Sequence, residues 1–490
     1  MISMKKSTII FSSIVLVLFV WHLWSLKYLP LPWFDEVVFS SITHSLINGD
    51  GFLCDAYTGE QLYTYGPVYF FLTAIPTSLF GFGVISFRIT NFLFTFLCMF
   101  PLWGIMRKRN VSKNIAYVCL IFYLTSFIIT QNMHMGRMEM VCLFFALSSY
   151  WIYYKFEGDI PPAWTLLFGL CISLAVLTTP RVAAILIPLG FAILYQIMKK
   201  KQWVQFLLLS ISVLGPYLVW IYASYGGVSE MFSSLTQPVN YGVQNKGSAL
   251  SQFVGGNFVI NFWDWAMILT SIFLVIASFY QKKWNCFVLP FSSIITYYLL
   301  VYDTGIYSTF IIPFFTIIIA FGFSIISKKT VLKRITFACL GLCFFVNLGM
   351  FSVRIASVVS SYDMRNPQPI SEWIGTKVPA GSRLVGDFRF FYACMDNNIR
   401  FRTNYKENYP SKLWWEELKT DFQPQYVMLS GENCDDMAEL NGLVLEKVAK
   451  YESINHDSAL RRLVKRFVPS NDTFDGVLYK IIGEKKTNNI

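Results

Sequence analysis

Acidic residues are scarce in the first 354 positions of this 490-residue chain, which hold eleven of its 29 aspartates and glutamates. Over the whole chain, 14% of residues are charged and 55% are hydrophobic. This balance excludes an ordinary soluble protein. Repeated apolar stretches of about 20 residues, the length that crosses a bilayer, instead predict a multi-pass membrane protein.

Several other motifs are missing. No Cys-x-x-Cys or Cys/His spacing indicates a structural metal, and most of the ten cysteines lie in apolar stretches, where cysteine usually packs as a small hydrophobe. Cys394 and Cys434 lie in a polar tail, and the sequence leaves open whether they pair. No glycine-rich phosphate-binding pattern is present, so no nucleotide cofactor is expected. The absence of an internal repeat argues against an inverted-repeat transporter.

The fold class expected is mainly α: a bundle of about eleven transmembrane helices over residues 1–354 and a small α/β domain over 355–490. Lys5 and Lys6 precede an apolar run without a small-residue cleavage site, which indicates a retained signal anchor. The expected spans lie near residues 8–26, 84–106, 115–132, 139–155, 164–179, 182–198, 203–222, 260–280, 287–302, 306–327 and 335–353.

Some shorter elements are also expected. The apolar segment 68–82 contains Pro76 and is too short to span, so we expect an interfacial or re-entrant helix. A further helix is expected at 36–47, just outside the first span. In the tail, strands are expected at 383–388, 426–430 and 477–482, and helices at 369–377 and 409–419.

The basic residues of the first 354 positions indicate how the bundle is oriented. Alternating connections place sixteen Lys and Arg on one side and six on the other, so the first side should be cytoplasmic. The N-terminus is then cytoplasmic and the tail is extracytoplasmic, on a cell (plasma or inner) membrane. The net charge of +11 reflects this asymmetry, and no basic cluster on a soluble face indicates a nucleic-acid partner.

The loop after the first span holds five of the eleven acids: Asp35, Glu36, Asp50, Asp55 and Glu60. Carboxylates beside hydrocarbon are energetically unfavourable, so such a cluster suggests a functional site. Asp35 and Glu36 lie at the start of the expected helix 36–47, where acids also complement the helix dipole. They are therefore either capping acids or a general base and cation ligands.

Cationic residues lie on the same outer side. Arg137 and Glu139 lie at the junction of the third and fourth expected spans. In one interpretation they form an ion pair that caps the fourth span. In the other, Arg137 binds a phosphate and Glu139 forms a carboxylate group together with Asp35. Arg88 and Arg181 either extend to lipid headgroups or bind a phosphate. His134 is either an interfacial histidine or a substrate contact.

Aromatic residues surround the turn at Gly66 and Pro67. Tyr63, Tyr65 and Tyr69 either stack on a sugar ring or belong to an interfacial aromatic belt.

Together these segments resemble the GT-C fold of lipid-linked sugar transferases, specifically the protein O-mannosyltransferases and the aminoarabinose and galacturonic-acid transferases that modify lipopolysaccharide. The resemblance rests on Asp35-Glu36, Gly66-Pro67-Val68-Tyr69, Phe87-Arg88-Ile89 and Arg137-Met138-Glu139. The stretch 371–387 also resembles the start of the extracytoplasmic domain of such enzymes. Where the aminoarabinose transferases carry Glu-Lys before the turn, this chain has Thr64 and Tyr65.

The resemblance implies a sugar donor linked to polyprenyl phosphate and an acceptor that is lipopolysaccharide, another glycan or a protein. It assigns Asp35 as the catalytic base or acceptor-orienting group, Glu139 as the second acid and Arg137 as a neighbour of the donor phosphate. Glu36 is the third catalytic candidate, and Arg88 and Arg181 are further phosphate ligands. A divalent metal shared by Asp35 and Glu139 and a metal-free site both agree with the sequence.

Two other functions use the same lipids. A transporter or flippase of lipid-linked glycans would carry charges at mid-membrane depth, whereas here they lie at the outer surface. An O-antigen ligase or polymerase would have a large late outer loop. The loop at 223–259 is of moderate size, and its only charged residues are Glu230 and Lys246.

Overall fold

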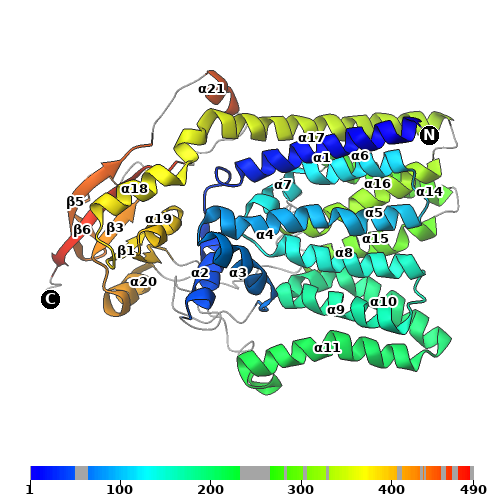
Figure 1. Ribbon diagram of the computed structural model, residues 1–490, viewed down its shortest axis with the longest axis horizontal. Helices are drawn as coiled ribbons and strands as arrows, with labels where there is room; N and C mark the ends of the chain where they lie inside the picture. Colours follow the sequence, from blue (N-terminus) through cyan, green and yellow to red (C-terminus); the bar gives the residue numbers. More distant parts are fainter. Residues whose placement is uncertain are drawn as a thin grey trace.

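Each of the eleven apolar stretches lies on a helix or a pair of helices in the protein's structure, a computed structural model (Figure 1). The structure describes residues 2–49, 65–231, 265–280, 284–301, 306–326, 330–405, 411–430, 434, 437–453, 459–465 and 473–485. The bundle helices are α1 (Ile2–Ser25), α4 (Val84–Leu97), α5 (Met99–Lys108), α6 (Lys113–Thr125), α7 (Phe127–His134), α8 (Glu139–Phe156), α9 (Pro162–Thr178), α10 (Ala183–Lys200), α11 (Trp203–Tyr225), α14 (Trp265–Tyr280), α15 (Val288–Leu300), α16 (Ile312–Ile326) and α17 (Thr330–Arg365).

One expected span is broken, and one connection between spans is a single turn. The third expected span is broken at Ser126, and α6 and α7 meet there at an angle of 55°. Between α9 and α10, Pro180 begins the single 3₁₀ turn η1 (Pro180–Val182), which agrees with the gap of two residues between the expected spans 164–179 and 182–198. Proline suits a first turn because its missing N–H would have no helical partner there.

By length and hydropathy, six helical stretches of the described residues can cross a membrane unaided, or seven if the bent pair α6–α7 counts as one span. Apolar helices of 10–17 residues lie at Val68–Phe80, Pro162–Thr178, Met267–Phe279 and Val288–Leu300. α16 runs through the middle of the bundle and is the most buried of the six, whereas α1 and α11 lie at its edges and expose apolar side chains.

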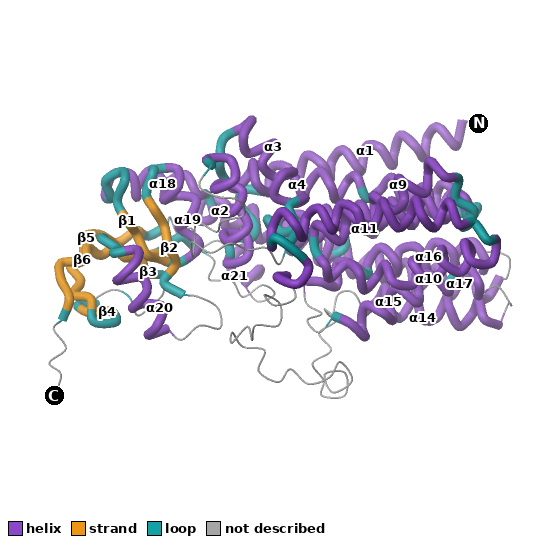
Figure 2. The backbone as a smooth tube through the Cα atoms, turned by 90° about the horizontal axis from the view of Figure 1, so that it is seen from below, coloured by secondary structure: helices purple, strands orange, loops and turns teal. Residues whose placement is uncertain are grey.

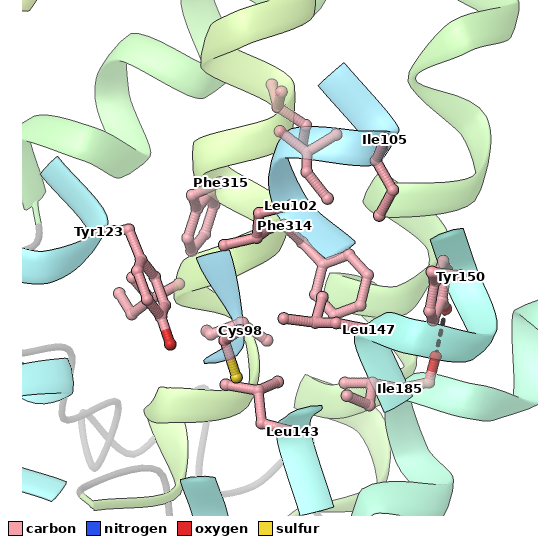
Figure 3. Packing of buried hydrophobic residues seen from close by; sticks show 14 of the residues in the cluster. Cys98, Leu102, Ile105, Tyr123, Leu143, Leu147, Tyr150, Ile185, Phe314 and Phe315 are labelled. Carbon is pink, nitrogen blue, oxygen red and sulfur yellow. Dashed lines mark hydrogen bonds between the residues drawn. The ribbon is translucent and has the colours of Figure 1, made fainter. Parts of the chain in front are cut away.

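The bundle core is built from side chains of α5, α6, α8, α10 and α16 that interdigitate around Cys98 and Leu147 (Figure 3). Tyr150 of this core is buried, and its hydroxyl donates to the Ile185 carbonyl of α10. A buried hydroxyl needs such a partner. This contact therefore joins α8 to α10 within an otherwise apolar interior.

α2 (Phe34–Asn48) and α3 (Val68–Phe80) lie at one end of the bundle, beside the C-terminal domain (Figures 1 and 2). α2 confirms the helix expected at 36–47, and α3 is the expected short helix of 68–82. In the acidic first loop, Asp50, Asp55, Glu60 and Tyr63 lie outside the described residues, as does most of the loop 223–259.

The C-terminal domain is an α/β unit with a six-stranded mixed sheet in the order β2-β1-β3-β6-β5-β4. β1 is parallel to β2 and β3, and the other pairs are antiparallel. Its elements are α18 (Pro367–Lys377), β1 (Arg383–Gly386), η5 (Phe388–Phe390), α19 (Phe391–Asp396), β2 (Arg400–Thr403), α20 (Ser411–Glu417), η6 (Leu418–Phe422), β3 (Tyr426–Leu429), β4 (Glu439–Leu440), β5 (Leu443–Tyr451), α21 (Ala459–Lys465) and β6 (Gly476–Glu484).

All three expected strands and both expected helices of the tail are present, whereas β2, β4, β5, α19 and α21 were not predicted. The strand β5 reads LVLEKVAKY, and its lysines and glutamate obscure the alternation typical of a strand. Cys394 is buried in α19 and Cys434 follows β3, and no disulfide joins them.

One apolar cluster fastens the C-terminal domain to the bundle. It joins Val37 and Phe39 of α2 and Phe87 of α4 to Ile374 of α18 and Phe391 of α19. The predicted boundary at residue 354 falls inside α17, which continues to Arg365 and reaches the C-terminal domain (Figure 1). The domain division at 354 stays a prediction.

Candidate functional site

Asp35, Arg137 and Glu139 meet at the end of the bundle that faces the C-terminal domain. Asp35 lies in the first turn of α2, and Arg137 and Glu139 lie where α7 passes into α8. Arg137 Nη1 donates to Asp35 Oδ2, while Nε and Nη2 donate to Glu139 Oε1 at 3.0 and 2.7 Å. The structure therefore brings together three residues that the sequence proposed for one site.

These three side chains differ in their access to solvent. Arg137 and Glu139 are 4% and 2% exposed, whereas Asp35 is 28% exposed. Burial lowers the pKa of Arg137, but the carboxylates of Glu139 and Asp35 outweigh it and raise that pKa above its usual value. Arg137 therefore stays charged, and Asp35 is the carboxylate of this group that a second molecule can reach.

Glu139 provides a further acceptor. Its Oε2 is buried and has no hydrogen-bond partner among the described residues. Buried carboxylate oxygens are usually paired, so an unpaired one beside a charged arginine indicates a position for a donor group from a ligand.

A second cation stands next to this group. Arg181 of η1 is exposed, and its Nη1 donates to the Tyr65 hydroxyl at 3.2 Å. The ring of Tyr307, from η4 (Ile306–Phe310), lies 4.4 Å from the Arg181 guanidinium and 5.1 Å from that of Arg137. Both distances suit cation–π attraction. Tyr307 thus holds two guanidinium groups beside one another.

Tyr307 and Trp33, whose ring lies 5.3 Å from the Arg137 guanidinium, were not predicted as site residues. Tyr307 follows Arg137 by 170 positions, so no local motif connects the two. Only the order of the expected spans could have pointed to Tyr307. It lies at the start of the tenth expected span, 306–327, and therefore at the same end of the bundle as Asp35.

Glu36 and Arg88 form a separate, fully buried ion pair. Arg88 Nε and Nη2 donate to the two oxygens of Glu36 at 2.6 and 2.7 Å, and Nη1 donates to the Leu26 carbonyl at 2.7 Å. Both side chains are 0% exposed. This geometry favours a structural role for both, in place of catalysis by Glu36 and phosphate binding by Arg88.

The remaining predicted contacts are also buried. His134 Nδ1 contacts the Leu29 carbonyl at 3.0 Å, and its Nε2 contacts His22 Nδ1 at 3.0 Å, so both ring nitrogens are engaged. Tyr69 is fully buried, with the rings of Phe39, Phe70 and Phe87 around it. These positions favour packing over sugar contact, which leaves Tyr65 as the predicted aromatic beside the site.

Gly136 allows the link between α7 and α8 to pack closely against α4 and α2. A Cβ on Gly136 would lie 2.3 Å from the Phe87 ring and 2.8 Å from Glu36 Cγ. Residue 136 must therefore lack a side chain for the α7–α8 link to pack against α4 and α2. This explains the glycine that directly precedes Arg137.

The donor set does not fit a divalent cation shared by Asp35 and Glu139. The Arg137 guanidinium stands between the two carboxylates and binds an oxygen of each. Among the described residues, no three His, Cys, Asp or Glu side chains come close enough to hold a metal ion. A cation placed between these carboxylates would be repelled by Arg137.

Comparison with known proteins gives a family match and a fold. Residues 64–220 match the family model for dolichyl-phosphate-mannose-protein mannosyltransferase. ArnT from Cupriavidus metallidurans superposes in its apo state with a TM-score of 0.62 at 13% identity, covering 97% of this chain and 98% of that one. ArnT bound to undecaprenyl phosphate gives a TM-score of 0.63 at 12% identity, covering 96% and 97%.

The archaeal oligosaccharyltransferase AglB from Archaeoglobus fulgidus has a TM-score of 0.49 at 11% identity, covering 86% of this chain and 69% of that chain. No curated protein sequence matches the chain. The two ArnT structures confirm the predicted fold, a GT-C-type helical bundle with a C-terminal α/β domain, over nearly the whole chain.

Proposed function

We propose that this protein is a membrane glycosyltransferase that moves a hexose or pentose from a polyprenyl-phosphate donor to an acceptor on the outer face of the membrane. The acceptor is lipopolysaccharide, another envelope glycan or a protein. The observation that carries the proposal is the partly exposed Asp35 carboxylate held by Arg137 and backed by Glu139. Support also comes from the match to a mannosyltransferase family and from the shared fold of ArnT, whose structure contains undecaprenyl phosphate.

The chemistry is a single displacement at the anomeric carbon of the sugar. Asp35 accepts the proton of the acceptor hydroxyl, whose oxygen forms the new bond to the anomeric carbon. The bond between that carbon and the phosphate oxygen breaks, and the polyprenyl phosphate leaves with the electron pair. Asp35 suits this role because it is the exposed carboxylate of the group.

Arg137 and Arg181 stabilise the charge that develops on the leaving phosphate. Their guanidinium groups stand on the ring of Tyr307 and are already in place before substrate binds. Preorganised cations of this kind stabilise a transition state without reorganisation at the moment of reaction. Arg181 is the more exposed of the two and is therefore the first contact for the donor phosphate.

The charged ends of the helices support the proposed orientation. α5, α8 and α10 carry Lys108, Lys155 and Lys199 in their last turns, at the end opposite to the C-terminal domain (Figure 1). Lysine and arginine favour the cytoplasmic side. Asp35 and the C-terminal domain then face away from the cytoplasm, where a donor and an envelope acceptor can meet.

The test is mass spectrometry of envelope glycolipids and glycoproteins from cells with and without this protein. We expect one species to lose a single pentose or hexose when the protein is removed. The purified protein should then restore that sugar in vitro from a polyprenyl-phosphate donor. Identical glycan profiles, together with no transfer in vitro, would overturn the proposal.

A further inference from the structure

A cavity of about 600 Å³ lies between the α3–α4 turn and helices α18 and α19 of the C-terminal domain. Its volume falls in the range of small-molecule sites. Neither Asp35 nor Arg137 lines it. The cavity is therefore distinct from the site described above.

The walls of the cavity divide by chemistry. The bundle side is apolar and includes Phe80, Val84 and Ile85, and the opposite side is polar and includes Ser371 and Glu372. Phe80 is 74% exposed and its neighbour Leu79 is 71% exposed, so the apolar wall continues onto the outer surface of the bundle. In a membrane-spanning bundle that surface contacts lipid chains, and an amphipathic molecule fits such a cavity best.

Charges of both signs face the same space. Lys27, just past α1, lines one part of the cavity, and Glu372 and Asp396 line another. Glu372 accepts from the Gln368 amide at 2.9 Å, and Asp396 accepts from the Ser371 hydroxyl at 3.1 Å. These donors are neutral, and within the described part of the chain neither carboxylate forms a salt bridge.

Among these groups Lys27 is half-buried, whereas Glu372 and Asp396 are exposed. Burial lowers the pKa of Lys27, and no carboxylate among the described residues offsets this effect. Partial desolvation raises the pKa of Asp396, and the Ser371 hydroxyl opposes this effect. A ligand with an anionic and a cationic group would compensate both charges at once.

We propose that this cavity binds a zwitterionic phospholipid that has an ammonium group in its head. Lys27 contacts the phosphate, Glu372 and Asp396 contact the ammonium, and the acyl chains follow Phe80 and Ile85 into the membrane. The inference does not depend on the proposed glycosyl transfer.

Tyr392 connects the cavity to α2, the helix that carries Asp35. Tyr392 lines the cavity, its ring stacks on Phe82 at 5.5 Å, and its hydroxyl lies 3.5 Å from Glu36 Oε1 on α2. A lipid in the cavity touches both the bundle and the C-terminal domain. It therefore strengthens their contact and steadies α2, the helix that carries Asp35.

The experiment uses the purified full-length protein, delipidated in detergent, with lipid binding followed by native mass spectrometry. Phosphatidylethanolamine should bind more tightly than phosphatidylglycerol, which shares the phosphate but lacks the ammonium. The double variant Glu372→Gln/Asp396→Asn should bind phosphatidylethanolamine about tenfold more weakly or worse and lose the preference, because hydrogen bonds to charged groups are lost. Lys27→Ala should weaken binding of both lipids.

Controls separate this site from general lipid adhesion. Lys108→Ala, an exposed lysine at the opposite end of the bundle, should leave both affinities unchanged. Glu372→Gln alone replaces an exposed side chain, so it tests the site if the double variant is poorly folded. Equal affinity for the two lipids in the unaltered protein would overturn the proposal, and so would displacement of the lipid by equimolar soluble phosphoethanolamine.

Discussion

Arg88 donates two parallel hydrogen bonds, of 2.6 and 2.7 Å, to the two carboxylate oxygens of Glu36, and neither side chain is exposed. The pair joins α4 to α2, and the Tyr392 hydroxyl at 3.5 Å extends it to the C-terminal domain. Three parts of the chain that are distant in sequence are therefore fixed to one another next to Asp35. This arrangement determines the direction in which α2 presents its first turn.

Glu36→Gln should destabilise the protein, because it leaves the buried Arg88 charge without its counter-ion. Removing one partner of a buried ion pair lowers the free energy of unfolding by about 3–5 kcal/mol. Thermal or denaturant unfolding in detergent measures the change. The matched control is Glu157→Gln, whose exposed pair with Lys108 should contribute less than about 1 kcal/mol. Normal stability combined with lost transfer would instead assign Glu36 to the chemistry.

Asp35→Asn should abolish sugar transfer while leaving folding and membrane insertion intact. A positioned general base typically contributes about 10²–10⁴-fold to the rate, and asparagine keeps the size of the side chain without its basicity. The measurement is turnover with a polyprenyl-phosphate sugar, beside a melting curve. Glu416→Gln, an exposed acid of the C-terminal domain, is the control and should keep full activity. Near-normal turnover by Asp35→Asn would contradict the assignment of the base.

Tyr307→Leu should raise KM for the donor, because it removes the ring on which Arg137 and Arg181 stand. Each cation–π contact contributes about 0.5–2 kcal/mol, which corresponds to roughly a 2–30-fold change in affinity. Tyr307→Phe keeps the ring and should retain most of the donor affinity. Steady-state kinetics with varied donor concentration separates KM from kcat. Equal losses in the two variants would show that the hydroxyl matters and the ring does not.

Gly66→Ala should weaken both stability and donor binding. A Cβ at residue 66 would lie 1.9 Å from the Leu177 carbonyl oxygen, a backbone atom at the end of α9 that cannot turn aside. The turn would have to move and carry Tyr65 away from Arg181. Gly190→Ala in α10 is the control, because nothing lies within 4 Å of its added Cβ. Equal melting temperatures for the two variants would refute the close approach of this turn to α9.

The two carboxylates of Asp35-Glu36 illustrate how far the sequence predicts a site. Acids in adjacent positions of a short helix point in different directions, and composition cannot say which of them faces a partner. In the fold, Asp35 meets Arg137 from 102 positions away, whereas Glu36 turns to Arg88. The sequence grouped both acids as catalytic, and the structure separates them: Asp35 joins Arg137 and Glu139, whereas Glu36 forms a buried ion pair with Arg88.

The sequence by itself determined the membrane class, the eleven helical stretches and the end of the bundle at which Asp35, Arg137 and Glu139 lie. These properties depend on local hydropathy and on the count of lysines and arginines, so neighbouring residues suffice to define them. Only the tertiary structure decided that Arg137 stands between Asp35 and Glu139 and that Tyr307 stands between Arg137 and Arg181. The choice of partner depends on how helices far apart in the sequence pack, and no local pattern records that packing.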